Sequence, residues 1–206
     1  MEIFDRKGHW ENIYLSKELT AASWYQPTPI TSLEFFREFN VPLTARIIDI
    51  GGGDSLLVDH LLELGYTDLT VLDISSAAID RAKQRLNPHA DRVKWIVSDI
   101  ATFDPTETYD FWHDRAAFHF LTADHEISNY IKSASNALAP AGILVIGTFS
   151  EKGPKKCSGI EIKQYSEATL ILRFQDYFRK IKCISVDHMT PFDTIQNFVF
   201  CSFRKL

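Results

Sequence analysis

The chain has 206 residues, a formal net charge of −5 at pH 7 and 45% hydrophobic residues, enough apolar surface for one sizeable core. Its acidic balance argues against a broad nucleic-acid-binding or anionic-membrane surface, and the local basic cluster Lys152, Lys155 and Lys156 is typical of a solvated loop. We therefore expect one domain over residues 1–206 that binds neither nucleic acid nor membranes.

The start of the chain lacks the basic and then apolar pattern of a secretory signal, and no stretch approaches the roughly 18 apolar residues of a membrane span. Its three cysteines, Cys157, Cys183 and Cys201, are widely spaced and form no CxxC motif. This pattern predicts reduced thiols rather than a disulfide framework or a zinc site. We expect a cytosolic protein without a metal centre.

Residues 1–30 are rich in aromatic side chains, and Pro27 and Pro29 mark a boundary between this N-terminal segment and a core over residues 31–206. The core opens with "RIIDIGGGDSLLVDHLLELG", residues 46–65. Its apolar run predicts a buried strand, and the leucines that follow at helical spacing predict a helix. Glycines between the two allow a sharp turn against which a ligand can lie, although a purely structural turn is the alternative.

The glycine turn differs from the known phosphate-binding patterns. The dinucleotide fingerprint requires glycine at its first, third and sixth positions, and Leu56 occupies the sixth. The phosphate loop is absent too, because no lysine follows the glycines within reach. The turn therefore favours a ligand without a phosphate and disfavours a nicotinamide-dependent oxidoreductase.

Strands and helices continue in alternation. We expect strands at 69–72, at 93–97, up to His113 or Asp114, and at 142–149, with helices from Ser75 or Ser76 to Leu86 and at 124–138, the latter stopped by Pro140 and Gly142. Right-handed crossovers then require a parallel sheet covered on both faces. A helix at 167–178 and two strands, 180–188 and 195–205, end the chain as an antiparallel hairpin at one sheet edge.

Five stretches in this order carry a resemblance to a known family: "DIGGG", "VLDIS", "SDI", "YDFWHDRAAFHFL" and "LAPAGILVI". Over most of its length the chain resembles the class I S-adenosylmethionine-dependent methyltransferases of the small methyltransferase-domain type. The resemblance implies an α/β fold with a Rossmann-like, seven-stranded, mostly parallel sheet, helices on both faces and a C-terminal antiparallel hairpin.

The resemblance also implies S-adenosylmethionine as the cofactor and S-adenosylhomocysteine as the product. Asp73 closes the second strand at the edge where such sheets bind ligands, and its carboxylate can accept hydrogen bonds from both ribose hydroxyls. Asp49 either organises this site or only caps the turn. The other positions implied to contact the cofactor are Gly51, Gly53 and the region of Asp114 at the methionine portion, and Ile74, Asp99 and Ile100 at the adenine.

The resemblance implies that residues 1–30 form a cover segment over the site. Its Trp10 and Tyr14 either contact the sulfonium by cation–π attraction or only dock an N-terminal helix. Methyl transfer needs chiefly alignment and sometimes removal of a proton. His119 is the best base in the sequence and Asp114 the second catalytic residue, with a core or helix-cap histidine as the alternative. His113, Arg115, His188 and the loop around Cys157 are further acceptor-side positions.

The sequence "HDRA" after the fourth strand replaces the Asn/Asp/Ser-Pro-Pro-aromatic turn of enzymes that methylate adenine or glutamine amide nitrogens, which argues against that chemistry. A single loop cysteine is thin support for a thiol or metalloid acceptor. We expect methyl transfer to a small molecule. A protein lysine, suggested by a resemblance through "SWYQ", and a noncatalytic partner-binding role remain alternatives.

Overall fold

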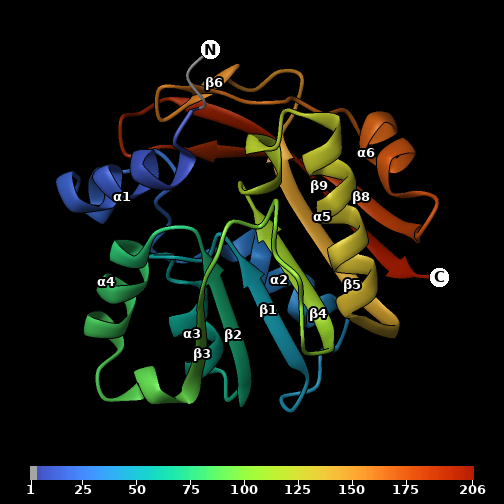
Figure 1. Cartoon of the computed structure of the whole chain (residues 1–206), viewed down its shortest axis with the longest axis horizontal. Helices are drawn as coiled ribbons and strands as arrows, with labels where there is room; N and C mark the ends of the chain where they lie inside the picture. The colour runs from blue at the N-terminus through green and yellow to red at the C-terminus, as the bar shows by residue number, and fades with distance from the viewer. Residues whose placement is uncertain (1–3) are drawn as a thin grey trace.

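A seven-stranded sheet forms the centre of the computed structural model, which describes residues 4–206 (Figure 1). Residues 1–3 of the expected cover segment lie outside the described part. The strand order is β3-β2-β1-β4-β5-β9-β8, in which the first five strands are parallel and β9 is antiparallel to both of its neighbours. These strands are β1 Arg46–Ile50, β2 Asp68–Asp73, β3 Val93–Val97, β4 Tyr109–Arg115, β5 Leu138–Phe149, β8 Phe178–Met189 and β9 Ile195–Lys205.

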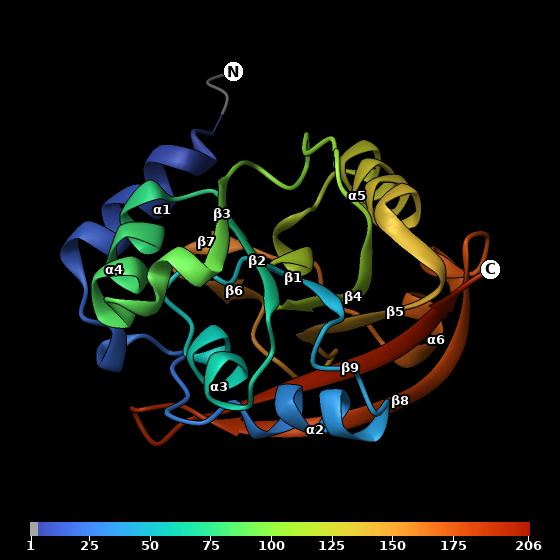
Figure 2. The same ribbon diagram turned by 90° about the horizontal axis from the view of Figure 1, so that it is seen from below.

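Helices cover both faces of the sheet, as Figure 2 shows for α2 and α5 on opposite sides. The helices and 3₁₀ turns are α1 Arg6–Ser16, η1 Leu19–Ala21, α2 Ile30–Glu38, α3 Leu57–Glu63, α4 Ser76–Leu86, η2 His89–Arg92, η3 Phe118–Phe120, α5 Asp124–Ala137 and α6 Glu167–Phe174. A short two-stranded ribbon, β6 Lys156–Cys157 and β7 Ile160–Glu161, lies between β5 and α6. Within residues 4–206, no helix is both long and apolar enough to cross a membrane.

Strand alternation divides the core into two layers. In β4, Phe111 packs with α2 and α3, whereas the next residue, Trp112, packs with α5 and α6 on the other face. Because side chains alternate along a strand, His113 belongs to the α2 face and Asp114 to the α5 face. This division decides which residues of β4 reach the site described below.

One predicted helix stop and one predicted helix end were wrong. The helix expected at 124–138 ends at Ala137, and Pro140 and Gly142 lie inside β5 rather than in a helix-stopping loop. The pairing of β5 with β4 is irregular between Tyr109 and Phe111. Pro140 lies in this irregular part of β5, where its missing N–H does not remove a hydrogen bond between the strands. The helix expected at 167–178 ends at Phe174, because Phe178 already begins β8.

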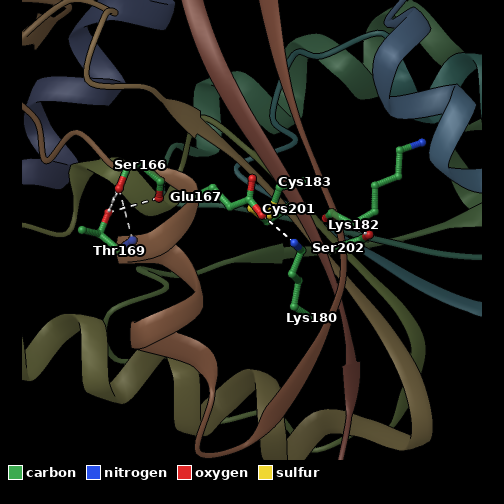
Figure 3. The surroundings of a disulfide bond; sticks show 8 residues. All are labelled: Ser166, Glu167, Thr169, Lys180, Lys182, Cys183, Cys201 and Ser202. Atoms are coloured by element: carbon green, nitrogen blue, oxygen red, sulfur yellow. Dashed lines mark hydrogen bonds and ion pairs between the residues drawn. A yellow bond between two sulfur atoms is a disulfide. The ribbon is translucent and has the colours of Figure 1, made fainter.

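The terminal hairpin was predicted correctly, but its cysteines were not. Cys183 of β8 lies directly opposite Cys201 of β9, with a Cα–Cα distance of 4.1 Å, and the two form a disulfide (Figure 3). The expectation of three reduced thiols is therefore corrected; Cys157 is a buried free cysteine. Beside the disulfide, Lys180 Nζ contacts Glu167 Oε1 at 2.5 Å and ties the hairpin to the start of α6.

Candidate active site

A cavity follows the carboxyl ends of β1 to β4, and Figure 1 shows α1 over the same edge of the sheet. Open α/β sheets bind ligands at this edge, at the point where the strand order reverses on either side of β1. Most of the positions predicted to contact a cofactor line the cavity: Trp10, Tyr14, Asp49, Gly51, Asp73, Ile74, Asp99 and Ile100. Gly53 and Asp114 do not line it.

The glycine turn is fixed to the neighbouring strand. Gly51 adopts φ +65° and donates its N–H to the carbonyl oxygen of Leu72 at 2.8 Å. Gly53 adopts φ +26°, and a Cβ atom at this position would lie 2.4 Å from Asp73 Oδ2. Gly53 therefore keeps space for the Asp73 carboxylate, although it does not itself face the cavity.

Asp73 is a buried carboxyl group with few partners. Its side chain is 4% exposed, and Oδ1 accepts a hydrogen bond from the N–H of Ser75 at 2.9 Å. Burial, together with the negative charge of Asp49, raises the pKa of Asp73 to about 7. A ligand that donates hydroxyl groups here would stabilise the ionised form, which is the recognition expected of a ribose.

The adenine end predicted from sequence lies at the carboxyl end of β3. Asp99 Oδ1 accepts a hydrogen bond from the N–H of Ala101 at 2.9 Å, and Oδ2 lies 3.1 Å from Arg6 Nη1 of helix α1. Arg6 also pairs with Glu126 at 2.5 Å. Ile74 and Ile100 add apolar wall beside this carboxylate.

The N-terminal segment is attached to the core by hydrogen bonds as well as by its aromatic side chains. Glu11 accepts from the hydroxyls of Ser75 and Ser76, at 2.7 and 2.6 Å, at the start of α4. Trp10 is 8% exposed and packs edge-on against Phe120, with 4.9 Å between ring centroids. The aromatic wall of the cavity is therefore held in place by polar contacts that lie outside the cavity.

A chain of three polar side chains, Asp49, His113 and Ser32, forms part of the cavity wall. His113 Nδ1 is 2.7 Å from Asp49 Oδ1, and His113 Nε2 is 2.9 Å from the hydroxyl of Ser32 in α2. Asp49 and His113 are directly opposite in the pairing of β1 with β4, and both are at most 5% exposed. The sequence indicated Asp49 and His113 as separate site positions but gave no sign of Ser32, because a serine within a predicted helix has no feature that identifies it as a hydrogen-bond partner of a distant histidine.

The two residues predicted to be catalytic face away from the cavity. Asp114 points to the α5 face, where its carboxylate accepts from the Tyr130 hydroxyl at 2.7 Å and from the N–H groups of Ala117 and Phe118. Burial above all raises the pKa of Asp114 to about 6. This carboxylate organises the turn after β4, so the geometry does not support contact with the acceptor.

His119 is fully buried and stacks on Phe149 at 4.6 Å between ring centroids. Its Nδ1 accepts a hydrogen bond from the N–H of Phe149 at 3.3 Å, and burial, with the charge of Arg115, lowers its pKa to about 3. An imidazole with so low a pKa is a poor base near neutral pH. The structure therefore favours the core histidine that was the alternative.

The other end of the cavity lies beyond β4 and is built from distant parts of the chain. Its wall includes Trp24, Arg115, Phe149, Cys157, Gln196 and Phe198. His188 is buried beside this end, where Nε2 donates to the carbonyl oxygen of Ser23 at 2.8 Å. Arg115 and Cys157 were among the acceptor-side positions, whereas Gln196 carried no signal in the sequence.

Comparison with known proteins agrees with this geometry. Residues 47–142 match a family model described as "Methyltransferase domain". The chain is 25% identical over 146 residues to "eEF1A lysine and N-terminal methyltransferase" of Mus musculus, covering 70% of this chain and 20% of that protein. It is 34% identical over 80 residues to "Nodulation protein S" of Rhizobium tropici, covering 39% of this chain and 33% of that protein. The matches thus span a minor part of these curated relatives.

Solved structures match nearly the whole chain. The N-methyltransferase NodS from Bradyrhizobium japonicum in complex with S-adenosyl-L-homocysteine superposes with a TM-score of 0.70 at 18% identity, over 98% of this chain and 99% of that one. A structure described as "Conversion of a Disulfide Bond into a Thioacetal Group during Echinomycin Biosynthesis" gives a TM-score of 0.77, again at 18% identity, over 97% and 92% of the two chains. Residues 47–142 thus match a methyltransferase-domain model, and nearly the whole chain shares the fold of solved methyltransferase structures.

Proposed function

We propose that this protein transfers a methyl group from S-adenosylmethionine to a nucleophilic atom of a small molecule. The observation that carries the proposal is the buried Asp73 carboxyl at the end of β2, which lines the cavity and whose pKa is raised to about 7, above all by burial. The ribose hydroxyls of the cofactor are donors of the required kind.

The remaining wall fits the rest of this cofactor. We assign Asp99 and the backbone of Ile100 to the adenine edge, Ile74 to the adenine face and Gly51 to the methionine portion. All four residues line the cavity, which supports this assignment. Trp10 and Tyr14 cover the site from the N-terminal segment. When bound, the cofactor supplies a methyl group already activated by the sulfonium.

Alignment is the catalytic device that this cavity supports best. Neither His119 nor Asp114 reaches it, and the buried chain of Asp49, His113 and Ser32 fixes the carboxyl ends of β1 and β4 against α2. Holding two reactants in a near-attack geometry can by itself supply roughly 7–11 kcal/mol of a barrier. We therefore assign Asp49 and His113 a positioning role.

A small-molecule acceptor fits the aromatic acceptor end better than a protein does. Trp24 and Phe198 wall this end, and helix α1 is hydrogen-bonded over the neighbouring cofactor end. The relatives include both kinds of enzyme: "Malonyl-[acyl-carrier protein] O-methyltransferase" and "EEF1A lysine methyltransferase 2" are each matched over part of this chain. Protein-lysine methylation is therefore the second candidate function.

Thermal unfolding of the purified protein with S-adenosylmethionine, S-adenosylhomocysteine or NAD tests the cofactor directly. We expect both sulfur-containing ligands to raise the melting temperature and NAD to leave it unchanged. A screen of small molecules and protein fractions with a labelled methyl donor then tests the acceptor. Stabilisation by NAD alone would contradict the proposal, and labelling confined to protein would favour the second candidate.

A further inference from the structure

Arg115 is a partly buried cation without a matching anion. It is the last residue of β4, and among the described residues its guanidinium has no carboxylate partner within ion-pair distance; Nη1 donates to the carbonyl oxygen of Trp24 at 3.0 Å. Nη2 is buried and has no hydrogen-bond partner within residues 4–206. Charges taken out of water normally require such partners.

The surroundings of Arg115 offset only part of this cost. Its Cζ lies 5.2 Å from the centroid of the Phe198 ring, a cation–π contact. Burial still lowers the pKa of Arg115 to about 10, so the side chain keeps its positive charge at neutral pH. The charge is therefore present and incompletely compensated.

A second polar group at the same end of the cavity lacks a partner. Gln196, near the start of β9, lines the cavity with Arg115, and its Oε1 atom is buried without a hydrogen bond among the described residues. The aromatic side chains of Trp24, Phe149 and Phe198 line the same cavity. Two incompletely satisfied polar groups on an aromatic wall indicate a site that a ligand completes.

We propose that the acceptor is a small aromatic carboxylate, whose carboxylate binds the Arg115 guanidinium while its ring packs on the aromatic wall and its polar edge meets Gln196. This assignment rests on the methyl-transfer function proposed above and names its substrate class. It also separates the two candidate functions, because a lysine ammonium would bring a second positive charge beside Arg115. Arg115 is a binding residue in this scheme and takes no part in proton transfer.

Matched pairs of ligands test the inference without an activity assay. Benzoate, 4-hydroxybenzoate and phenylacetate are titrated calorimetrically into the protein saturated with S-adenosylhomocysteine, each beside its neutral amide. We expect the carboxylates to bind roughly 10- to 100-fold more tightly than the amides, the scale of one to two hydrogen bonds to a charged group. Arg115→Gln should abolish this preference and leave S-adenosylhomocysteine affinity within about twofold.

Two further variants keep the test decisive. Arg179→Gln removes an exposed positive charge from β8 and should preserve the preference, which controls for net charge. Arg115→Lys retains the charge without the planar fork and should lower the preference without abolishing it; it replaces Arg115→Gln if that variant does not fold.

The inference is overturned if no carboxylate binds more tightly than its amide, or if the preference survives in the Arg115 variants. Failure of wild-type protein to bind S-adenosylhomocysteine would contradict the proposed function instead. The carboxylate and amide pairs would then be compared on the ligand-free protein and judged by the same criterion.

Discussion

The five parallel strands and the C-terminal hairpin contribute to the cavity in different ways. Strands β1, β2 and β3 each deliver an acidic residue, at or just after their carboxyl ends, to the cofactor half: Asp49, Asp73 and Asp99. The hairpin delivers Gln196 and Phe198 from the start of β9, the strand that is antiparallel to both of its neighbours. Under the proposed function, the acidic residues of β1 to β3 face a cationic cofactor, whereas the end of β4 and the start of β9 present the Arg115 cation and aromatic rings to the acceptor.

This difference suggests that the parallel strands serve cofactor binding and that the hairpin serves stability and acceptor binding. Changes in the parallel half should alter cofactor affinity, whereas changes in the hairpin should alter stability or acceptor choice with the cofactor still bound. The boundary between them runs along β4 and β5, where His113 faces α2 and Asp114 faces α5.

The largest expected effect concerns the hairpin disulfide. Replacing both Cys183 and Cys201 by alanine should lower the free energy of unfolding by about 3 kcal/mol, because the cross-link closes a loop of moderate length in the unfolded chain. Denaturant unfolding measures this loss. Reductant should weaken the wild-type protein by a similar amount and leave the double variant unchanged. S-adenosylhomocysteine affinity should not change, and a large loss of affinity would break the proposed separation.

In the parallel half, Asp73→Ala should weaken S-adenosylmethionine binding by roughly 1.5–3 kcal/mol, the scale of hydrogen bonds to a charged group, with the fold retained. Calorimetry measures the affinity. Asp68→Asn, at the opposite end of the same strand, is the matched control and should bind normally. Unchanged affinity in a folded Asp73→Ala protein would rule out the ribose contact.

Sequence alone predicted the parallel half well, for a physical reason. Buried strands are recognisable in a sequence as runs of β-branched residues. The glycine turn and the acidic residues of the site lie within a few positions of the strand ends, so they can be located once the strands are known. Asp73, Ile74, Asp99 and Ile100 line the cavity where the resemblance placed them, although ligand contact itself stays a prediction.

The rest depends on register and on which face a side chain occupies. Asp114 was expected in the site because it ends a strand, but alternation turns it toward Tyr130 on the other face. The disulfide was not predicted. Cys183 and Cys201 are equally distant in sequence from Phe192, at the centre of the hairpin turn, and the hairpin register therefore places them opposite each other. Gln196 and Ser32 carry no local signal, since only the folded chain brings them near β4.

The pH dependence of cofactor binding should sharpen the comparison further. Folding raises the pKa of Asp73 to about 7 from about 3.9 in an unfolded chain. The folded, ligand-free protein thus holds a proton that the unfolded chain releases, and this stabilising contribution is lost as pH rises from about 4 to 7. Hydroxyl donors of the cofactor favour the ionised carboxylate, so affinity should fall about tenfold between pH 8 and pH 6.

Asp73→Asn should show no such pH dependence when calorimetry is repeated across the same range. Asp114, with a pKa raised to about 6, affects stability in the same direction but lies outside the cavity, so Asp114→Asn should keep the wild-type binding profile. If the pH dependence of binding disappeared in Asp114→Asn and not in Asp73→Asn, the titrating group would be Asp114, on the other face of β4.

The smallest expected effect on catalysis belongs to His119. Because this imidazole is fully buried, stacks on Phe149 and has a pKa of about 3, its replacement should leave turnover within about twofold once an acceptor is known. His119→Gln, which can keep the hydrogen bond from the Phe149 N–H, should cost less stability than His119→Leu, which leaves that buried donor unpaired at roughly 1–3 kcal/mol. The turnover of both variants is compared at a pH where chemistry limits the rate. A loss of turnover of roughly 10²-fold or more in folded protein, equal in the two variants, would restore His119 as the general base, and would require the end of β5 to move so that the imidazole reaches the acceptor.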